Sequence, residues 1–99
     1  MSFEDLQQSI ARDSAPPADA NLAVQALWHD ARGEWDKAHN CAQDDHGNHG
    51  SWVHAYLHRK EGDLGNAGYW YTRAGRTMPA KSVTLEQEWT DIARQLVGR

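Results

Sequence analysis

Ala-Arg-Gly-Glu-Trp-Asp-Lys-Ala at residues 31–38 decides the fold, because it recurs 29 residues later as Lys-Glu-Gly-Asp-Leu-Gly-Asn-Ala at residues 60–67. Each copy predicts a helix that ends at a glycine, followed by an acidic residue that begins a second helix. Helices joined by so few residues lie antiparallel, and the alanine in each second helix lets them approach closely. Internal repeats of this length are typical of helical solenoid units. We therefore expect two helical hairpins, at residues 21–43 and 51–76.

The segments around the hairpins predict one further helix on either side. A capping-box pattern indicates an N-terminal helix within residues 1–12. Residues 13–20 form a linker, because Pro16-Pro17 cannot continue a helix. Residues 21–80 are the repeat region, and a second capping-box pattern beyond it predicts a C-terminal helix at residues 83–97.

The composition favours a small helical protein over a disordered chain. The 99 residues have a net charge of only −4 and include five tryptophans and three tyrosines, whose large side chains replace scarce aliphatic ones. No segment of four or more residues alternates between apolar and polar side chains, so no sheet is expected. The expected fold class is all-α, a compact single domain of five or six antiparallel helices spanning residues 1–99.

Several functional classes are excluded by the same features. No apolar run approaches the roughly 18–20 residues that cross a bilayer, and the acidic N-terminus lacks a secretory signal. The single cysteine, Cys41, fits a reducing compartment, so we expect a cytoplasmic protein with no membrane partner. Residues 54–81 carry five basic and two acidic side chains, which falls short of a nucleic-acid footprint. Nucleic acid is therefore not expected as a partner.

The repeat region resembles a known family. Gly-Asp-Leu-Gly-Asn-Ala at residues 62–67, followed by Tyr71, Ala74 and Pro79, is similar to the second half of a tetratricopeptide repeat, and residues 33–38 resemble the same part of an earlier unit. The resemblance implies a right-handed helical stack with a concave face that binds peptides or partner helices. Two units are fewer than the roughly three that a free-standing array needs, so the N- and C-terminal helices are expected to cap the stack.

A protein- or peptide-binding module is the first function that we expect. Side chains from the first helix of each hairpin would line its concave side, and further side chains would come from the second helix of the second hairpin. Aromatic and arginine side chains of this kind are typical of binding hot spots. The candidate binding residues are Trp28, His29, Trp52, His54, His58, Arg59, Trp70 and Arg73.

The alternative is a small-ligand-binding protein or a small enzyme that uses the same histidine, arginine and aromatic cluster on the second, fourth and fifth helices. His29 and His58 hold equivalent positions in the two units, and they either pack at a helix seam or line a pocket. A closed pocket onto which both converge would favour a small ligand, and an open groove would favour a peptide. Cys41 with His39 or His46 resembles no catalytic signature, so no catalytic residue is assigned.

A metal site is a further alternative. His54 and His58 are four residues apart, which places both on one helix face at a spacing that can grip a metal ion. No Cys-x-x-Cys or His-Glu-x-x-His motif accompanies them, and residues 44–50 are more simply a solvated loop. No metal or other cofactor is therefore expected, although further ligand types lie upstream at His39, Cys41, Asp44, Asp45, His46 and His49.

Self-association is expected at an apolar end of the stack. The C-terminal helix should cover one end with an apolar stripe, whereas the N-terminal helix offers a thinner cover; the stripe is Leu85, Trp89, Ile92, Leu96 and Val97. An uncovered end would expose more than the few hundred Å² of apolar surface that soluble monomers normally show, and two-fold pairing is the commonest way to bury such a patch. We therefore expect a homodimer formed through an uncapped end rather than through the acidic loop at 44–50.

Overall fold

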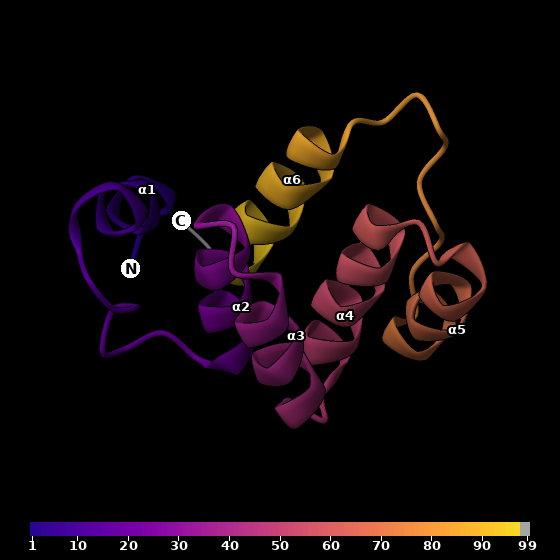
Figure 1. Ribbon diagram of the computed structural model, residues 1–99, viewed down its shortest axis with the longest axis horizontal. Coiled ribbons are helices and arrows are strands. Elements are labelled where there is room, and N and C mark those ends of the chain that lie inside the picture. The colour runs from indigo at the N-terminus through magenta and orange to yellow at the C-terminus, as the bar shows by residue number, and fades with distance from the viewer. Residues whose placement is uncertain (98–99) are drawn as a thin grey trace.

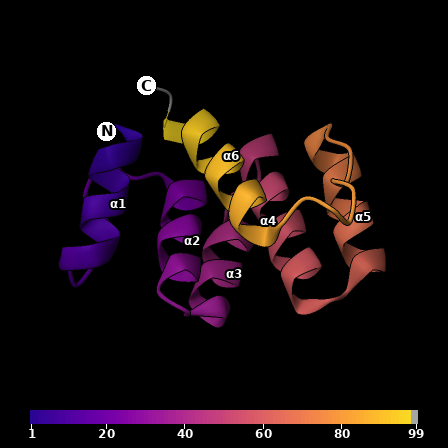
Figure 2. The same cartoon turned by 90° about the horizontal axis from the view of Figure 1, so that it is seen from above.

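This computed structural model describes residues 1–97, which contain six α-helices. They are α1 (Phe3–Arg12), α2 (Leu22–Ala31), α3 (Trp35–Asp44), α4 (Asn48–Glu61), α5 (Leu64–Ala74) and α6 (Leu85–Val97), as Figure 1 shows. The described residues contain no strand, so the all-α class is confirmed. Helices α2 to α5 pack one after another as two antiparallel hairpins (Figure 2). None of the helices in this range is long and apolar enough to cross a membrane.

Both predicted capping boxes are present at the helix starts. The Asp5 amide donates to Ser2 Oγ at 3.0 Å, and the Ser2 amide donates back to the Asp5 carboxylate at 3.1 Å. Thr84 and Gln87 exchange the same pair of hydrogen bonds before α6, at 2.8 and 3.0 Å. These bonds satisfy amide groups that have no partner inside the helix, so α1 and α6 begin where the sequence predicts.

The two hairpins turn in the same way. Gly33 follows α2 with φ +76°, and Gly62 follows α4 with φ +89°, both in the left-handed region that favours glycine. In each turn the amide of the acidic residue after the glycine donates to the carbonyl of the histidine five residues earlier, at 2.9 Å. This shared geometry is the physical reason for the repeated glycine-acid pair.

One hydrophobic core draws on all six helices. Small side chains at the helix contacts let the hairpins pack tightly, and large side chains fill the space between hairpins and flanking helices. The fully buried alanines are Ala23, Ala26, Ala38, Ala42, Ala55, Ala67 and Ala93. The largest fully buried side chains are Trp28, Tyr71, Leu6, Leu27, Leu57, Ile92 and Val53.

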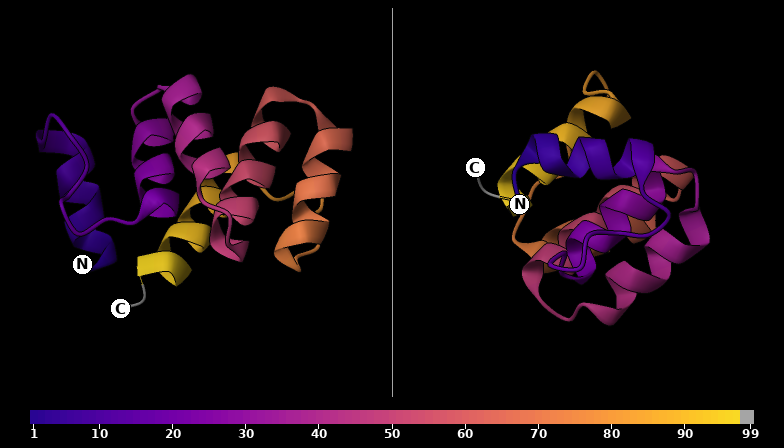
Figure 3. Two further views of the ribbon diagram at one scale, coloured as in Figure 1. Left: turned by 90° about the horizontal axis from the view of Figure 1, so that it is seen from below. Right: turned by 90° about the vertical axis from the view of Figure 1, so that its left-hand side faces the viewer.

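Helix α6 lies across α2 and α4 and reaches α1, instead of forming the next layer beyond α5 (Figure 3). Its backbone stays away from α5, which it contacts through side chains. Trp89 Nε1 donates to the carbonyl of Leu27 at 3.1 Å, a contact that spans 62 residues of sequence. The expectation that this helix covers an end of the stack is thereby corrected: it covers a side, because residues 75–84 carry the chain back over the hairpins.

The start of the fourth helix also differs from the prediction. Helix α4 begins at Asn48, within the stretch 44–50 that was expected to be a loop, so the connection from α3 is only residues 45–47. A Cβ at Gly50 would lie 2.3 Å from the carbonyl oxygen of Asp45. The glycine therefore allows the end of α3 to approach the first turn of α4 closely, and it does not mark a loop.

We expect Gly50→Ala to lower the free energy of unfolding by about 1–3 kcal/mol, because the added methyl group overlaps backbone atoms of the short connection. Gly65→Ala is the matched control, since a Cβ at Gly65 meets no atom of residues 1–97 within 4 Å, and it should be neutral or slightly stabilising. Urea unfolding followed by circular dichroism measures both. Equal stabilities of the two variants would contradict the packing role of Gly50.

Candidate functional site

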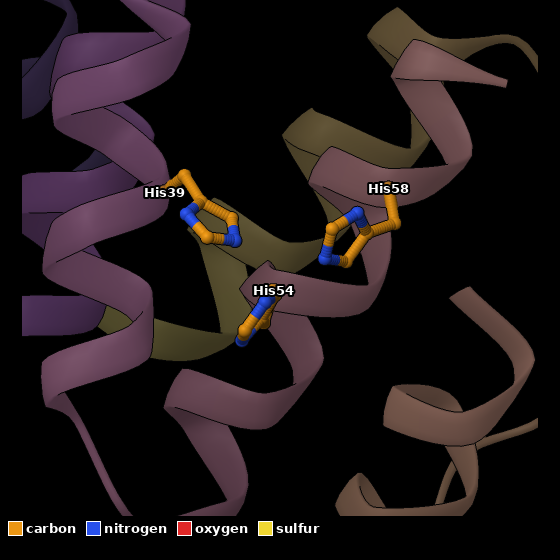
Figure 4. Close-up of side chains that lie close together, drawn as sticks. All are labelled: His39, His54 and His58. Atoms are coloured by element: carbon orange, nitrogen blue, oxygen red, sulfur yellow. The ribbon is translucent and has the colours of Figure 1, made fainter. Parts of the chain in front are cut away.

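Three histidines meet where α3 packs against α4. His54 and His58 lie on one face of α4, and His39 comes from α3 (Figure 4). One ring nitrogen of each lies within 4.8 Å of the others. The His54 and His58 rings are stacked with centroids 4.8 Å apart, and the His39 ring stands edge-on to them at 4.6 and 5.3 Å. Helical spacing on α4 and the contact between the hairpins thus bring three imidazoles together; these three residues are the histidine cluster.

Two tryptophans extend the histidine cluster. Trp35 stacks on His39 with ring centroids 4.9 Å apart, and Trp70 of α5 stacks on His54 at 3.9 Å. Trp35 Nε1 also donates to a backbone carbonyl of α4 at 3.1 Å, which holds α3 against α4. The Arg73 guanidinium lies 5.2 Å from the Trp70 ring centroid, a cation–π contact. The cluster is therefore held by aromatic packing from three helices.

Hydrogen bonding distinguishes His54 from His58. His58 Nδ1 lies 2.6 Å from Glu61 Oε1, so the favoured tautomer donates from Nδ1 and leaves an unprotonated Nε2. His54 is only 4% exposed, and its Nδ1 is the one buried side-chain nitrogen or oxygen in residues 1–97 that has no hydrogen-bond partner. Such an atom costs about 1–3 kcal/mol. It is the feature of the cluster that packing alone does not explain.

The surroundings keep two of the imidazoles uncharged. Burial, together with smaller contributions from the neighbouring His39 and His58, lowers the pKa of His54 to about 4. Burial also lowers the pKa of His39, with a contribution from His58, against the opposing charges of Glu61 and Asp36. At neutral pH each of these two rings therefore carries an unprotonated nitrogen whose lone pair is available to a ligand.

Of the eight binding residues expected from the sequence, the structure brings four together: His54, His58, Trp70 and Arg73. Trp28 is buried near α1, where its Nε1 donates to Ser9 Oγ at 3.0 Å. His29 lies outside the histidine cluster, and its Nδ1 is 2.8 Å from the carboxylate of Glu34 in the turn after α2. His29 and His58 therefore do not converge on one pocket.

The remaining two expected residues lie near α6. Trp52 is buried, with the Arg76 guanidinium 3.7 Å from its ring centroid. Arg59 Nη1 donates to Glu88 of α6 at 2.8 Å. The side of α2 and α4 on which the sequence places an open groove is thus covered by the chain's own C-terminal helix.

Sequence reasoning missed the partners that α3 contributes. His39 entered as one of several upstream ligand types and as a possible partner of Cys41, and Trp35 was not considered as a site residue. Trp35 and His39 are four residues apart, as are His54 and His58, and this matching spacing on two adjacent helices was the available signal. His46 and His49 are exposed and lie outside the cluster. Burial and the neighbouring Asp44 raise the pKa of the Cys41 thiol, which makes it a weaker nucleophile.

No family model matches the chain, and neither the curated proteins nor the solved structures contain a significant match to it. What the protein does is therefore inferred from its own residues and their arrangement.

Proposed function

We propose that the protein is a small helical-repeat module, similar to tetratricopeptide units, that binds a peptide or protein partner. The equivalent turns of the α2–α3 and α4–α5 hairpins and their consecutive packing support this proposal. Each unit of such an array packs on its neighbours, so the last helix keeps one face without a partner. Here that helix is α5, whose backbone packs against α4 alone among the described helices.

The binding surface that we propose is a pocket beside the first turn of α5, because α6 covers the side of α2 and α4. Leu64 is the first residue of α5, and it is 49% exposed, so its side chain can contact a partner. The pocket has a volume of about 350 Å³ and combines apolar side chains with two cations; it is lined by Arg59, Leu64, Met78, Pro79, Lys81 and Leu85. This apolar, cation-bearing pocket is the observation that carries the proposal.

Charge complementarity defines the partner. Arg59 is already paired with Glu88, whereas Lys81 is exposed and forms no ion pair with any carboxylate in residues 1–97. A peptide with a large apolar side chain next to an aspartate or glutamate fits this surface. The apolar side chain would contact Leu64, and the carboxylate would pair with Lys81.

Selection from a random-peptide display library tests the proposal. We expect the enriched peptides to combine a large apolar residue with an adjacent carboxylate. Leu64→Ser and Lys81→Glu should each weaken binding of an enriched peptide about tenfold or more, because the loss of an anchor residue costs about 1.4 kcal/mol or more. Leu22→Ser is the matched control, since Leu22 is also an exposed leucine (36%) at the first position of a helix. Enriched peptides without this pattern, or binding that survives both substitutions, would contradict the proposal.

A second copy of the chain is the other candidate occupant of this surface, in keeping with the expected homodimer. Light scattering at micromolar concentration separates the two cases. A mass of 11.2 kDa is that of the monomer and leaves the surface to a peptide. A doubled mass that returns to the monomer value in Leu64→Ser would show that a second copy of the chain, and not a peptide, occupies this surface.

The second candidate function is the binding of a small ligand at the histidine cluster. The unpartnered Nδ1 of the buried His54 is the observation that favours it. The cluster shares no residue with the pocket at Leu64. The two functions can therefore be tested separately in the same protein.

A further inference from the structure

We propose that His39, His54 and His58 bind one divalent transition-metal ion of the zinc type. This inference rests on the second candidate function, a small ligand at the histidine cluster, and it names the chemistry of that ligand. It is independent of the peptide pocket, with which the cluster shares no residue.

The donor set and its geometry support a metal of this class. Imidazole nitrogen suits zinc, copper, nickel and cobalt, whereas magnesium and calcium prefer oxygen ligands. The three ligand nitrogens lie within 4.8 Å of one another, and Figure 4 shows ring nitrogens of His39 and His58 facing each other beside His54. Tetrahedral coordination with Zn–N bonds of about 2.0–2.1 Å places nitrogens about 3.4 Å apart. To bind one ion, the nitrogens would therefore have to approach one another by at most about 1.4 Å.

His54 supplies an observation that points to a ligand independently of this spacing. The ring is nine-tenths buried or more, yet its Nδ1 has no hydrogen-bond partner in residues 1–97. Most buried side-chain polar atoms in proteins have at least one hydrogen-bond partner, so an unpartnered ring nitrogen needs an explanation other than packing. A ring held between His58 and Trp70 by stacking, with a nitrogen left over, is placed to bind a ligand.

Glu61 prepares His58 for metal binding. Its carboxylate accepts from Nδ1 at 2.6 Å, which orients the ring and leaves Nε2 as the ligand atom, the carboxylate–histidine–metal arrangement. The negative charges of Glu61 and Asp36 act on the cluster and offset the charge of a divalent ion. The low pKa values of His54 and His39 also mean that few protons compete with the metal at neutral pH.

Three histidines leave one position of a tetrahedral ion open to water or to a further ligand. A competing ligand set, His58 with Glu61 and Asp63, shares His58. It uses two exposed carboxylates and does not involve the unpartnered His54. The three-histidine set is therefore the one that we assign, and variants can tell the two sets apart.

Calorimetric titration of the untagged, chelator-treated protein with Zn²⁺ tests the site, with Co²⁺ as a visible probe of coordination. We expect one ion per chain and cobalt bands of tetrahedral intensity. His39→Gln should lower the affinity at least about 30-fold by removing a ligand, and Glu61→Gln about 10-fold or more by removing the carboxylate that orients His58. The double variant His46→Gln/His49→Gln is the matched control, because both histidines are exposed near the α3–α4 connection, and it should bind as the unaltered chain does.

Two results would overturn the three-histidine site. One is unchanged affinity in a His39→Gln variant whose helical circular dichroism is intact. The other is loss of binding in Asp63→Ser, which keeps a capping hydroxyl at the start of α5 but removes a carboxylate of the competing set.

Histidine ring NMR separates failure of the metal inference from failure of the second candidate function. Resonances of the cluster should shift with Zn²⁺. If these resonances shift with phosphate or acetate but not with Zn²⁺, the metal inference is overturned, whereas the small-ligand function of the cluster is supported. No shift with any of these probes would overturn both, and it would leave the peptide selection at Leu64 as a separate result.

Discussion

Glu88→Ala is expected to lower the free energy of unfolding by about 3–5 kcal/mol, because it leaves a partly buried arginine without its counter-charge. Glu88 is 4% exposed. One carboxylate oxygen accepts from Arg59 Nη1 at 2.8 Å, and the other accepts from the Tyr71 hydroxyl. The carboxylate thus joins α6 to α4 and α5, and its loss should loosen α6 from the hairpins.

Urea unfolding measures this loss, and hydrogen exchange in α6 shows whether that helix opens first. Glu86→Ala is the control, because Glu86 lies in the same first turn but is exposed; it should change the stability by less than about 0.5 kcal/mol. Similar stabilities for the two variants would mean that apolar packing around Ile92 alone holds α6 in place.

The position of α6 bears on the proposed function. In a tetratricopeptide-like module a partner is expected on the concave side, and here α6 lies across α2 and α4. Trp89 contacts α2, and Glu88 contacts α4 and α5. The pocket at Leu64 is therefore the more accessible surface while α6 lies across α2 and α4. Glu88→Ala should expose the side of α2 and α4 that α6 covers.

Acidification from pH 7 to pH 4 is expected to destabilise the metal-free protein by up to about 3 kcal/mol through His54 alone. The pKa of His54 is about 4 in the folded protein, against 6.5 for an unperturbed histidine. Between these values the unfolded chain binds a proton that the folded chain does not. The stabilisation is therefore complete above about pH 6.5 and is lost as the pH falls towards 4. His39, whose pKa is also lowered, acts in the same direction.

Urea unfolding at a series of pH values, in the presence of a chelator, tests this dependence. His54→Phe keeps an aromatic ring between His58 and Trp70 but cannot titrate, so its stability should fall less steeply with acid. His46→Gln is the control, because His46 is exposed and lies outside the cluster; its curve should follow that of the unaltered chain. Parallel curves for His54→Phe and the unaltered chain would show that His54 does not titrate as the structure indicates.

The sequence by itself determined the features that depend on near neighbours. Capping boxes at Ser2 and Thr84 and left-handed turns at Gly33 and Gly62 predicted where helices begin and end, because their hydrogen bonds join residues at most five positions apart. Helical spacing also placed His54 on the same face as His58 before any tertiary contact was known.

Only the tertiary structure decided which of these faces meet. His39 contacts His54 because the first hairpin packs against the second. Position 50 of α4 requires a glycine because Asp45 occupies the space that a side chain would fill. Glu88 reaches Arg59 because α6 crosses the hairpins. Such pairings depend on the angles at which turns redirect the chain and on which surfaces bury the most apolar area together. Local spacing encodes neither quantity, so the histidine cluster and the cover formed by α6 emerged only from the packed fold.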